Sequence, residues 1–174
     1  MKRIEFEHVV RAAGAILASD EILVIGSQAL HGSLDKLPPE AERSIEVDVA
    51  VIGDLDGTRA DLIDASIGEA SSFHETFGYY AQGVVETTAI LPEGWRERLV
   101  RFESSGTGGV VACCLEPHDL WIAKAIAGRP KDLEFCGALL RLGLVGGKLL
   151  RRRLGQVPDL TSDVREAILG RISG

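Results

Sequence analysis

Two acidic residues, Glu46 and Asp48, stand two positions apart in the stretch SIEVDVAVI at residues 44–52. Strict period-two alternation predicts a β-strand there, and it places the two carboxylates side by side on one face. The opposite face carries Ile45, Val47, Val49 and Val51. Half-buried carboxylates this close repel one another, and a divalent cation such as Mg²⁺, which also holds substrate phosphates, relieves the repulsion. The alternative interpretation is the solvated polar face of an edge strand.

A second stretch, EILVIGSQAL at residues 21–30, places Gly26 and Ser27 directly after an apolar run. The run predicts a strand at 21–25, and a helix-compatible segment follows it without a hairpin signal. Glycine lets the backbone approach a ligand closely, and a serine hydroxyl beside the free N–H groups of a helix N-terminus suits a phosphate. The alternative is a plain turn in which Ser27 caps the helix.

The remaining hydrophobic pattern predicts the elements that must position these residues. Helices are expected at 2–18, 58–68, 118–127, 130–142, 146–154 and 162–172. Strands are expected at 21–25, 44–52, 84–91, 98–103 and 110–115. Residues 32–42 are expected to form a loop, because Pro38 and Pro39 disfavour a helix in the residues before them.

This order of elements predicts an α/β (α+β) protein with two regions. Residues 1–116 are expected to form a mixed sheet flanked by helices, and residues 117–174 a helical C-terminal tail packed on that core. A chain of 174 residues is long enough for one compact domain with such an appendage.

Net charge, hydropathy and cysteine spacing limit the kinds of molecule that the protein is expected to bind. The net charge of −7, from 19 Lys and Arg against 26 Asp and Glu, argues against a surface that coats nucleic acid but allows a local basic site. The segment MKRIEFEHVV lacks the apolar core of a signal peptide, and no stretch approaches the roughly 18 apolar residues of a membrane span. Cys113, Cys114 and Cys136 lack metal-ligand spacing. We expect a soluble, cytoplasmic protein without a membrane partner.

The Gly26-Ser27 pair followed by the IEVDV strand resembles the nucleotidyltransferase superfamily with the DNA polymerase beta fold. The pattern of that superfamily is a hydrophobic residue, Gly and Gly or Ser, and then two acids spaced by one residue on a strand. The segments VIGSQAL, FHETFGYYAQGV, LPEGWRERLV, HDLWIAKAIAGRPKD and LLRLGLV are similar to a bacterial branch labelled DUF6036, related to AbiEii/MenT-type toxins. The resemblance covers roughly residues 3–155.

The resemblance implies roles for the two stretches described first. Gly26 and Ser27 would hold the triphosphate of an NTP, and Glu46 and Asp48 would bind Mg²⁺ in a site that can take two ions. Glu86, in VVETTA, is the expected third acid, as a metal ligand or a general base.

The toxin branch adds a lysine and then an aspartate after the sheet, matched here by Lys124 and by Asp132 in GRPKD. The resemblance implies that Lys124 neutralises phosphate charge and that Asp132 orients the base or the neighbouring Arg129 and Lys131. Lys124, Arg129 and Lys131 are therefore the expected cationic contacts of the nucleotide.

Three other groups of residues have ordinary structural explanations. His74 with Tyr79-Tyr80 is expected to pack in a loop-rich stretch, with contact to a nucleotide base as the alternative. Asp119 suits the first turn of a helix. The basic run KLLRRRL at 148–154 is expected to be a solvated helix face, with an RNA contact as the alternative.

The expected function is Mg²⁺-dependent transfer of an NMP from an NTP to a macromolecular acceptor, either tRNA or protein. The resemblance to the toxin branch implies that such an enzyme is one component of a toxin–antitoxin pair and binds the protein partner of that pair. The alternative is a catalytically inactive nucleotidyltransferase-like module that binds another protein, as an antitoxin does. Two features depart from the superfamily pattern. The long segment 28–45 is expected to reshape the entrance for the nucleotide, and a glutamate as the first acid, Glu46, is expected to loosen the metal geometry.

Overall fold

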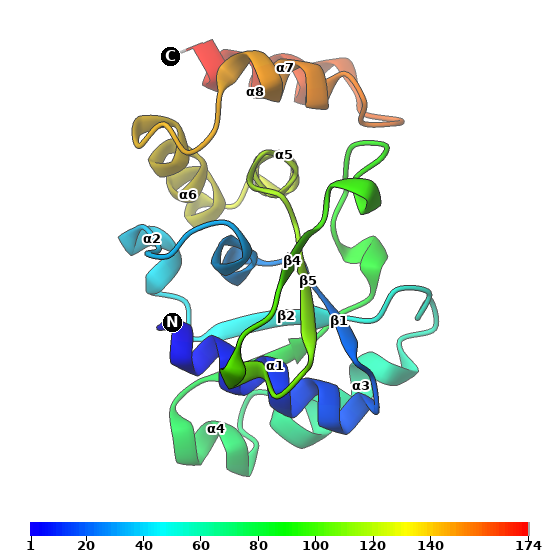
Figure 1. The fold of residues 1–174 in the computed structure, drawn as a ribbon. Coiled ribbons are helices and arrows are strands. Elements are labelled where there is room, and N and C mark those ends of the chain that lie inside the picture. Colours follow the sequence, from blue (N-terminus) through cyan, green and yellow to red (C-terminus); the bar gives the residue numbers. More distant parts are fainter. Residues whose placement is uncertain (174) are drawn as a thin grey trace.

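A five-stranded mixed sheet in the order β3-β2-β1-β5-β4 forms the centre of the protein (Figure 1). The structure, a computed structural model, describes residues 1–173. The strands are β1 (Glu21–Val24), β2 (Glu46–Ala50), β3 (Tyr80–Gly83), β4 (Val100–Phe102) and β5 (Val111–Cys114). The central strand β1 pairs antiparallel with β2 and parallel with β5, while β3 runs parallel to β2 and β4 antiparallel to β5.

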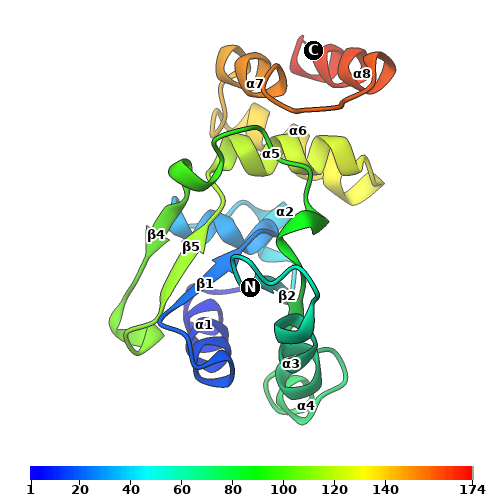
Figure 2. The same ribbon diagram turned by 90° about the vertical axis from the view of Figure 1, so that its right-hand side faces the viewer.

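Helices cover both faces of this sheet (Figures 1 and 2). One side is covered by α1 (Arg3–Leu17), α3 (Thr58–Ile67) and α4 (Ser72–Phe77). The other side holds α2 (Pro39–Glu42), α5 (Pro117–Ala127) and α6 (Pro130–Arg141), with α7 (Gly147–Leu154) and α8 (Ser162–Ser173) as an outer layer. Because both faces are covered, all four residues of β5 are buried.

The amphipathic pattern of residues 3–17 explains why helix α1 forms and packs on the sheet (Figure 1). Helix α1 buries Phe6, Val9, Val10, Ala13 and Leu17, which recur at the three- and four-residue spacing of one helix face. It ends where Ala18 adopts a left-handed conformation with φ of 46°. The predicted helix at 2–18 is therefore confirmed, as are the later helices near their predicted bounds.

The predicted third strand at 84–91 is wrong. The third strand is β3, and residues Glu86–Thr88 form a 3₁₀ turn beyond its end. Strand β3 is short, lies at the sheet edge and is fixed by β2: the Tyr80 N–H donates to the Ile45 carbonyl at 3.0 Å and the Val84 N–H to the Val49 carbonyl at 2.9 Å. In VVETTAIL, Val84 and Leu91 are buried and Ile90 is exposed, so the apolar content of this segment was a misleading signal for a strand.

The segment expected to be a loop, 32–42, contains the short helix α2, with Pro39 in its first turn. Helix α5 buries Leu120, Trp121 and Ile122 in the same apolar core as α1 and β1. The division of the chain into a core at 1–116 and a tail at 117–174 stays a prediction. None of the helices in the described part of the chain has the length and apolarity needed to cross a bilayer.

Candidate functional site

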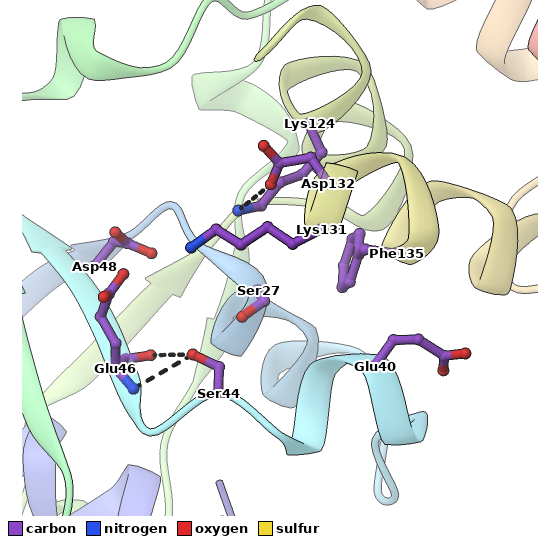
Figure 3. A pocket seen from close by; sticks show the side chains of 9 residues that line it. All are labelled: Ser27, Glu40, Ser44, Glu46, Asp48, Lys124, Lys131, Asp132 and Phe135. Atoms are coloured by element: carbon purple, nitrogen blue, oxygen red, sulfur yellow. Dashed lines mark hydrogen bonds and ion pairs between the residues drawn. The ribbon is translucent and has the colours of Figure 1, made fainter. Parts of the chain in front are cut away.

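A small polar pocket, with a volume of about 80 Å³, opens between β2 and the α5–α6 hairpin (Figure 3). Its walls come from segments far apart in the sequence: the turn after β1, α2, β2, α5 and α6. The lining residues are Ser27, Glu40, Ser44, Glu46, Asp48, Lys124, Lys131, Asp132 and Phe135. Most of the residues that the sequence singled out for chemistry therefore meet in one place.

Strand β2 places the acid pair in this pocket. Val47 and Val49 are buried on one face, and Glu46 and Asp48 lie half-buried on the other, with their carboxylates close together in Figure 3. Burial raises the pKa of Asp48 to about 6, the Glu46 carboxylate adds to the rise, and Lys124 opposes it. Burying two neighbouring carboxylates is unfavourable without a cation. A pair of this kind matches the ligands of Mg²⁺, which is bound by one or two carboxylates together with substrate phosphates.

The turn after β1 lies directly against the acid pair. A Cβ atom on Gly26 would lie 1.5 Å from Oδ2 of Asp48, so only glycine leaves room for that carboxylate. Ser27 is the first residue of the 3₁₀ segment Ser27–Gly32 and Gly26 is its N-cap, so the alternative in which Ser27 caps the helix is wrong. Its hydroxyl instead lies toward the pocket (Figure 3).

The opposite wall carries positive charge. Nζ of Lys124, on α5, lies 3.2 Å from Oδ1 of Asp132, and Nε of Arg129 lies 2.6 Å from Oδ2 of the same carboxylate. Burial works to raise the pKa of Asp132, but the hydrogen bond from Arg129 and the charge of Lys124 hold that pKa below its usual value. Lys131 extends across the pocket toward the acid pair (Figure 3). Asp132 therefore holds the side chains of Lys124 and Arg129 in place.

Glu86 lies elsewhere and is not among the residues that line the pocket within the described chain. Oε1 of Glu86 forms an ion pair with Nη2 of Arg96 at 2.5 Å, and Oε2 accepts a 3.5 Å hydrogen bond from the Gly53 N–H. Its position beyond β3, in a 3₁₀ turn, follows from the corrected third strand. The structure does not bring the expected third acid to Glu46 and Asp48. Arg129 does not line the pocket, and its guanidinium reaches the site through the ion pair with Asp132.

Two residues of β3 occupy the edge beside the acid pair, and sequence reasoning did not place them there. Tyr80 is the register partner of Glu46, and Gln82 is the partner of Asp48. The Tyr80 hydroxyl donates to Oε2 of Glu46 at 2.9 Å, and burial followed by this hydrogen bond raises the pKa of Tyr80. The period-two spacing of Tyr80 and Gln82 is the signal that was available, had the strand been assigned to 80–83.

No three Cys, His, Asp or Glu side chains gather into a metal-binding group within residues 1–173. The pocket thus offers two carboxylates to a cation, and its remaining ligands would come from substrate phosphates and water. Neutral and cationic groups on the turn and on α5–α6 face the space where those phosphates would lie. The arrangement places two carboxylates opposite cationic side chains, which is the combination that a metal ion and a polyphosphate require.

Comparison with curated proteins and with solved structures gives no match. A family model described as nucleotidyltransferase of unknown function (DUF6036) matches residues 5–164, which include every residue of the pocket. A relation to AbiEii/MenT-type toxins stays a prediction. The mixed sheet flanked by helices is consistent with a nucleotidyltransferase-like fold. The chain belongs to this family of nucleotidyltransferases.

Proposed function

We propose that the protein is a Mg²⁺-dependent nucleotidyltransferase that moves an NMP from an NTP to a macromolecular acceptor. The observation that supports this most directly is the meeting, in one pocket, of the Gly26-Ser27 turn, the Glu46/Asp48 pair and the lysines of α5–α6. The turn suits the phosphates of the NTP, the acid pair suits the metal ion, and the lysines suit the negative charge of the phosphates.

In this proposal Glu46 and Asp48 hold the metal, and the Ser27 hydroxyl with the backbone of the turn holds the terminal phosphates. Lys124, oriented by Asp132, and Lys131 neutralise phosphate charge. Bound Mg²⁺ supplies stabilisation of the entering and leaving oxygens. The acceptor oxygen forms a bond to the α-phosphorus, the bond from that phosphorus to the bridging oxygen breaks, pyrophosphate leaves, and the acceptor proton passes to water.

The small volume of the pocket indicates where the acceptor would bind. A volume of about 80 Å³ is well below the roughly 300–1,000 Å³ of pockets that enclose a whole drug-sized ligand. The pocket fits phosphates and metal, and the base and the acceptor would then lie at its open rim. A macromolecule, tRNA or protein, reaches such a rim readily. We keep the toxin–antitoxin role and a protein partner as parts of this proposal that rest on the sequence resemblance. A cytoplasmic location is a further part, which rests on the hydropathy of the sequence.

A second candidate function is a non-catalytic nucleotidyltransferase-like module that binds another protein. The position of Glu86 favours it, because the acid expected to complete the metal site is paired with Arg96 outside the pocket. A two-carboxylate site can bind Mg²⁺ with a nucleotide without transferring it.

Transfer of a labelled α-phosphate from NTP to an acceptor distinguishes the nucleotidyltransferase from the non-catalytic module. The purified protein is incubated with each α-labelled NTP, Mg²⁺ and a cell extract that contains RNA and protein acceptors, and bands are followed on gels. Wild type is expected to label an RNA or protein band, whereas Asp48→Asn is expected to fail because it removes a metal ligand. Gly26→Ala is expected to fail as well, because the new methyl displaces the Asp48 carboxylate.

Gly170→Ala is the matched control, since a Cβ there meets nothing within 4 Å. Label that moves equally with wild type and Asp48→Asn would refute the proposed site. Binding of Mg²⁺ and NTP by calorimetry, without transfer of label from any NTP, would favour the non-catalytic module.

A further inference from the structure

We propose that Tyr80 is a positioning residue that keeps the Glu46 carboxylate monodentate and thereby makes the pocket prefer Mg²⁺ over Ca²⁺. This inference rests on the proposed function, because it requires Glu46 and Asp48 to hold the metal. Its structural basis is the 2.9 Å hydrogen bond from the Tyr80 hydroxyl to Oε2 of Glu46. That bond uses one lone pair of Oε2 and holds this oxygen toward the hydroxyl, which leaves Oε1 as the freer oxygen for a cation.

The hydroxyl is held in place by the sheet and by packing. Tyr80 is the register partner of Glu46 across the parallel β2–β3 pair, so the two side chains project from the same face. Its backbone N–H is bonded to the Ile45 carbonyl. The ring packs against His74 with 4.7 Å between centroids, and the residue is only 9% exposed. Tyr80 therefore has little freedom to release Oε2.

The number of available oxygens distinguishes the two cations. Mg²⁺ requires near-octahedral geometry with short bonds and is commonly held by single carboxylate oxygens, whereas Ca²⁺ takes six to eight ligands and accepts bidentate carboxylates. A glutamate whose second oxygen is held toward a fixed hydroxyl can give its first oxygen to Mg²⁺, whereas turning both oxygens to Ca²⁺ would weaken the hydrogen bond. The longer side chain of glutamate makes this restraint useful, since it has one more rotatable bond than aspartate.

The test measures metal affinity without nucleotide and without turnover. Binding of Mn²⁺ is followed through the EPR signal of the free ion, and competition by MgCl₂ and by CaCl₂ gives the Mg²⁺/Ca²⁺ preference. Tyr80→Phe is expected to lower that preference about 3- to 10-fold, the range set by the loss of one hydrogen bond. Tyr79→Phe is the matched control, because its hydroxyl is bonded to Nδ1 of His8 at 2.9 Å, outside the pocket.

Glu46→Asp, made alone and together with Tyr80→Phe, provides a second test. The shorter side chain draws the carboxylate away from the hydroxyl, so adding Tyr80→Phe to it is expected to leave the preference unchanged. An unchanged preference in Tyr80→Phe alone, or an equal change in Tyr79→Phe, overturns the inference and leaves the metal site standing. If wild type binds Mn²⁺ no more tightly than Asp48→Asn does, the proposed metal site fails and the inference fails with it.

Discussion

Asp48 and Glu46 share one face of β2, and in the absence of a cation their repulsion is met only in part by Lys124 and Lys131. The pKa of Asp48 is about 6 in the folded protein and near its usual value in the unfolded chain. Between these two pH values the folded protein therefore binds more protons at Asp48 than the unfolded chain does. In the metal-free protein the destabilising contribution of Asp48 therefore decreases as pH falls from 6 to 4. Above pH 6 the full cost of the charged Asp48 is present.

We expect Asp48→Asn to be more stable than wild type in EDTA at neutral pH. The shift of roughly two pKa units corresponds to about 1 to 3 kcal/mol, allowing for solvent screening. Urea unfolding at pH values from 4 to 8 measures it: the advantage of the variant should be smallest near pH 4 and reach its plateau above pH 6 to 7. A difference that is constant across this range would contradict the explanation.

Asp132 supplies a control of opposite sign in the same pocket. Its pKa is lowered when folded, so its contribution to stability is present above its unfolded pKa and is lost as pH falls through the folded value. Asp132→Asn is therefore expected to destabilise the protein at neutral pH and to approach wild type in acid. The two variants should move in opposite directions at pH 7.

Strand β3 shows how an element can be defined by its neighbours more than by its own sequence. Its four residues, YAQG, carry one glycine and one exposed polar side chain. Gly83, at its end, donates its N–H to Oδ1 of Asp64 at 2.7 Å, and the backbone of α3 approaches it closely. A Cβ atom on Gly83 would lie 2.0 Å from the Ala60 carbonyl oxygen.

Gly83→Ala is expected to separate β3 from α3 and to lower stability by about 2 kcal/mol or more, because backbone atoms cannot yield as side chains do. For a chain of this size that corresponds to roughly 4 to 8 °C in Tm. Thermal unfolding by circular dichroism measures the change. Gly146→Ala is the control, since a Cβ there has open space; equal losses in both variants would contradict the close approach as the cause.

Local spacing in the sequence was enough to predict β2, the acid pair and the Gly26-Ser27 turn, because each depends on residues close together in the chain. Lys124 and Asp132 came from the resemblance alone, and their ion pair needs two helices folded against each other. Tyr80 could not be placed, because its role depends on the pairing of β3 with β2. The strand expected at 84–91 failed because apolar residues at both ends of this segment also suit a loop that packs on the core.

Three distant parts of the molecule meet at the buried Asp119, whose side chain is 1% exposed. Arg98, just before β4, donates to it from Nε at 2.7 Å and from Nη2 at 3.1 Å, and Nε of Arg153 on α7 lies 3.4 Å away. Sequence reasoning assigned Asp119 to the first turn of a helix, and it does lie in the first turn of α5. Its larger role is to join α5, α7 and the segment before β4.

Asp119→Asn is expected to lower stability by about 3 kcal/mol or more, because it leaves two largely buried guanidinium groups without a full counter-charge. A drop in Tm of roughly 6 to 12 °C should follow, while Mn²⁺ binding at low temperature is retained. The control is Glu166→Gln on the exposed face of α8. Unchanged thermal unfolding of Asp119→Asn would contradict this role.

The position of β1 in the middle of the sheet has a consequence for synthesis of the chain. Leu23 pairs with Ala50 on one side and with Cys113 on the other, so β1 cannot gain its second neighbour until the fifth strand has been made. Contacts between such distant residues slow folding. A nascent chain on the ribosome would hold β1 with one edge open until β5 has been made, and the acid pair would meet its lysines only after α6 had emerged.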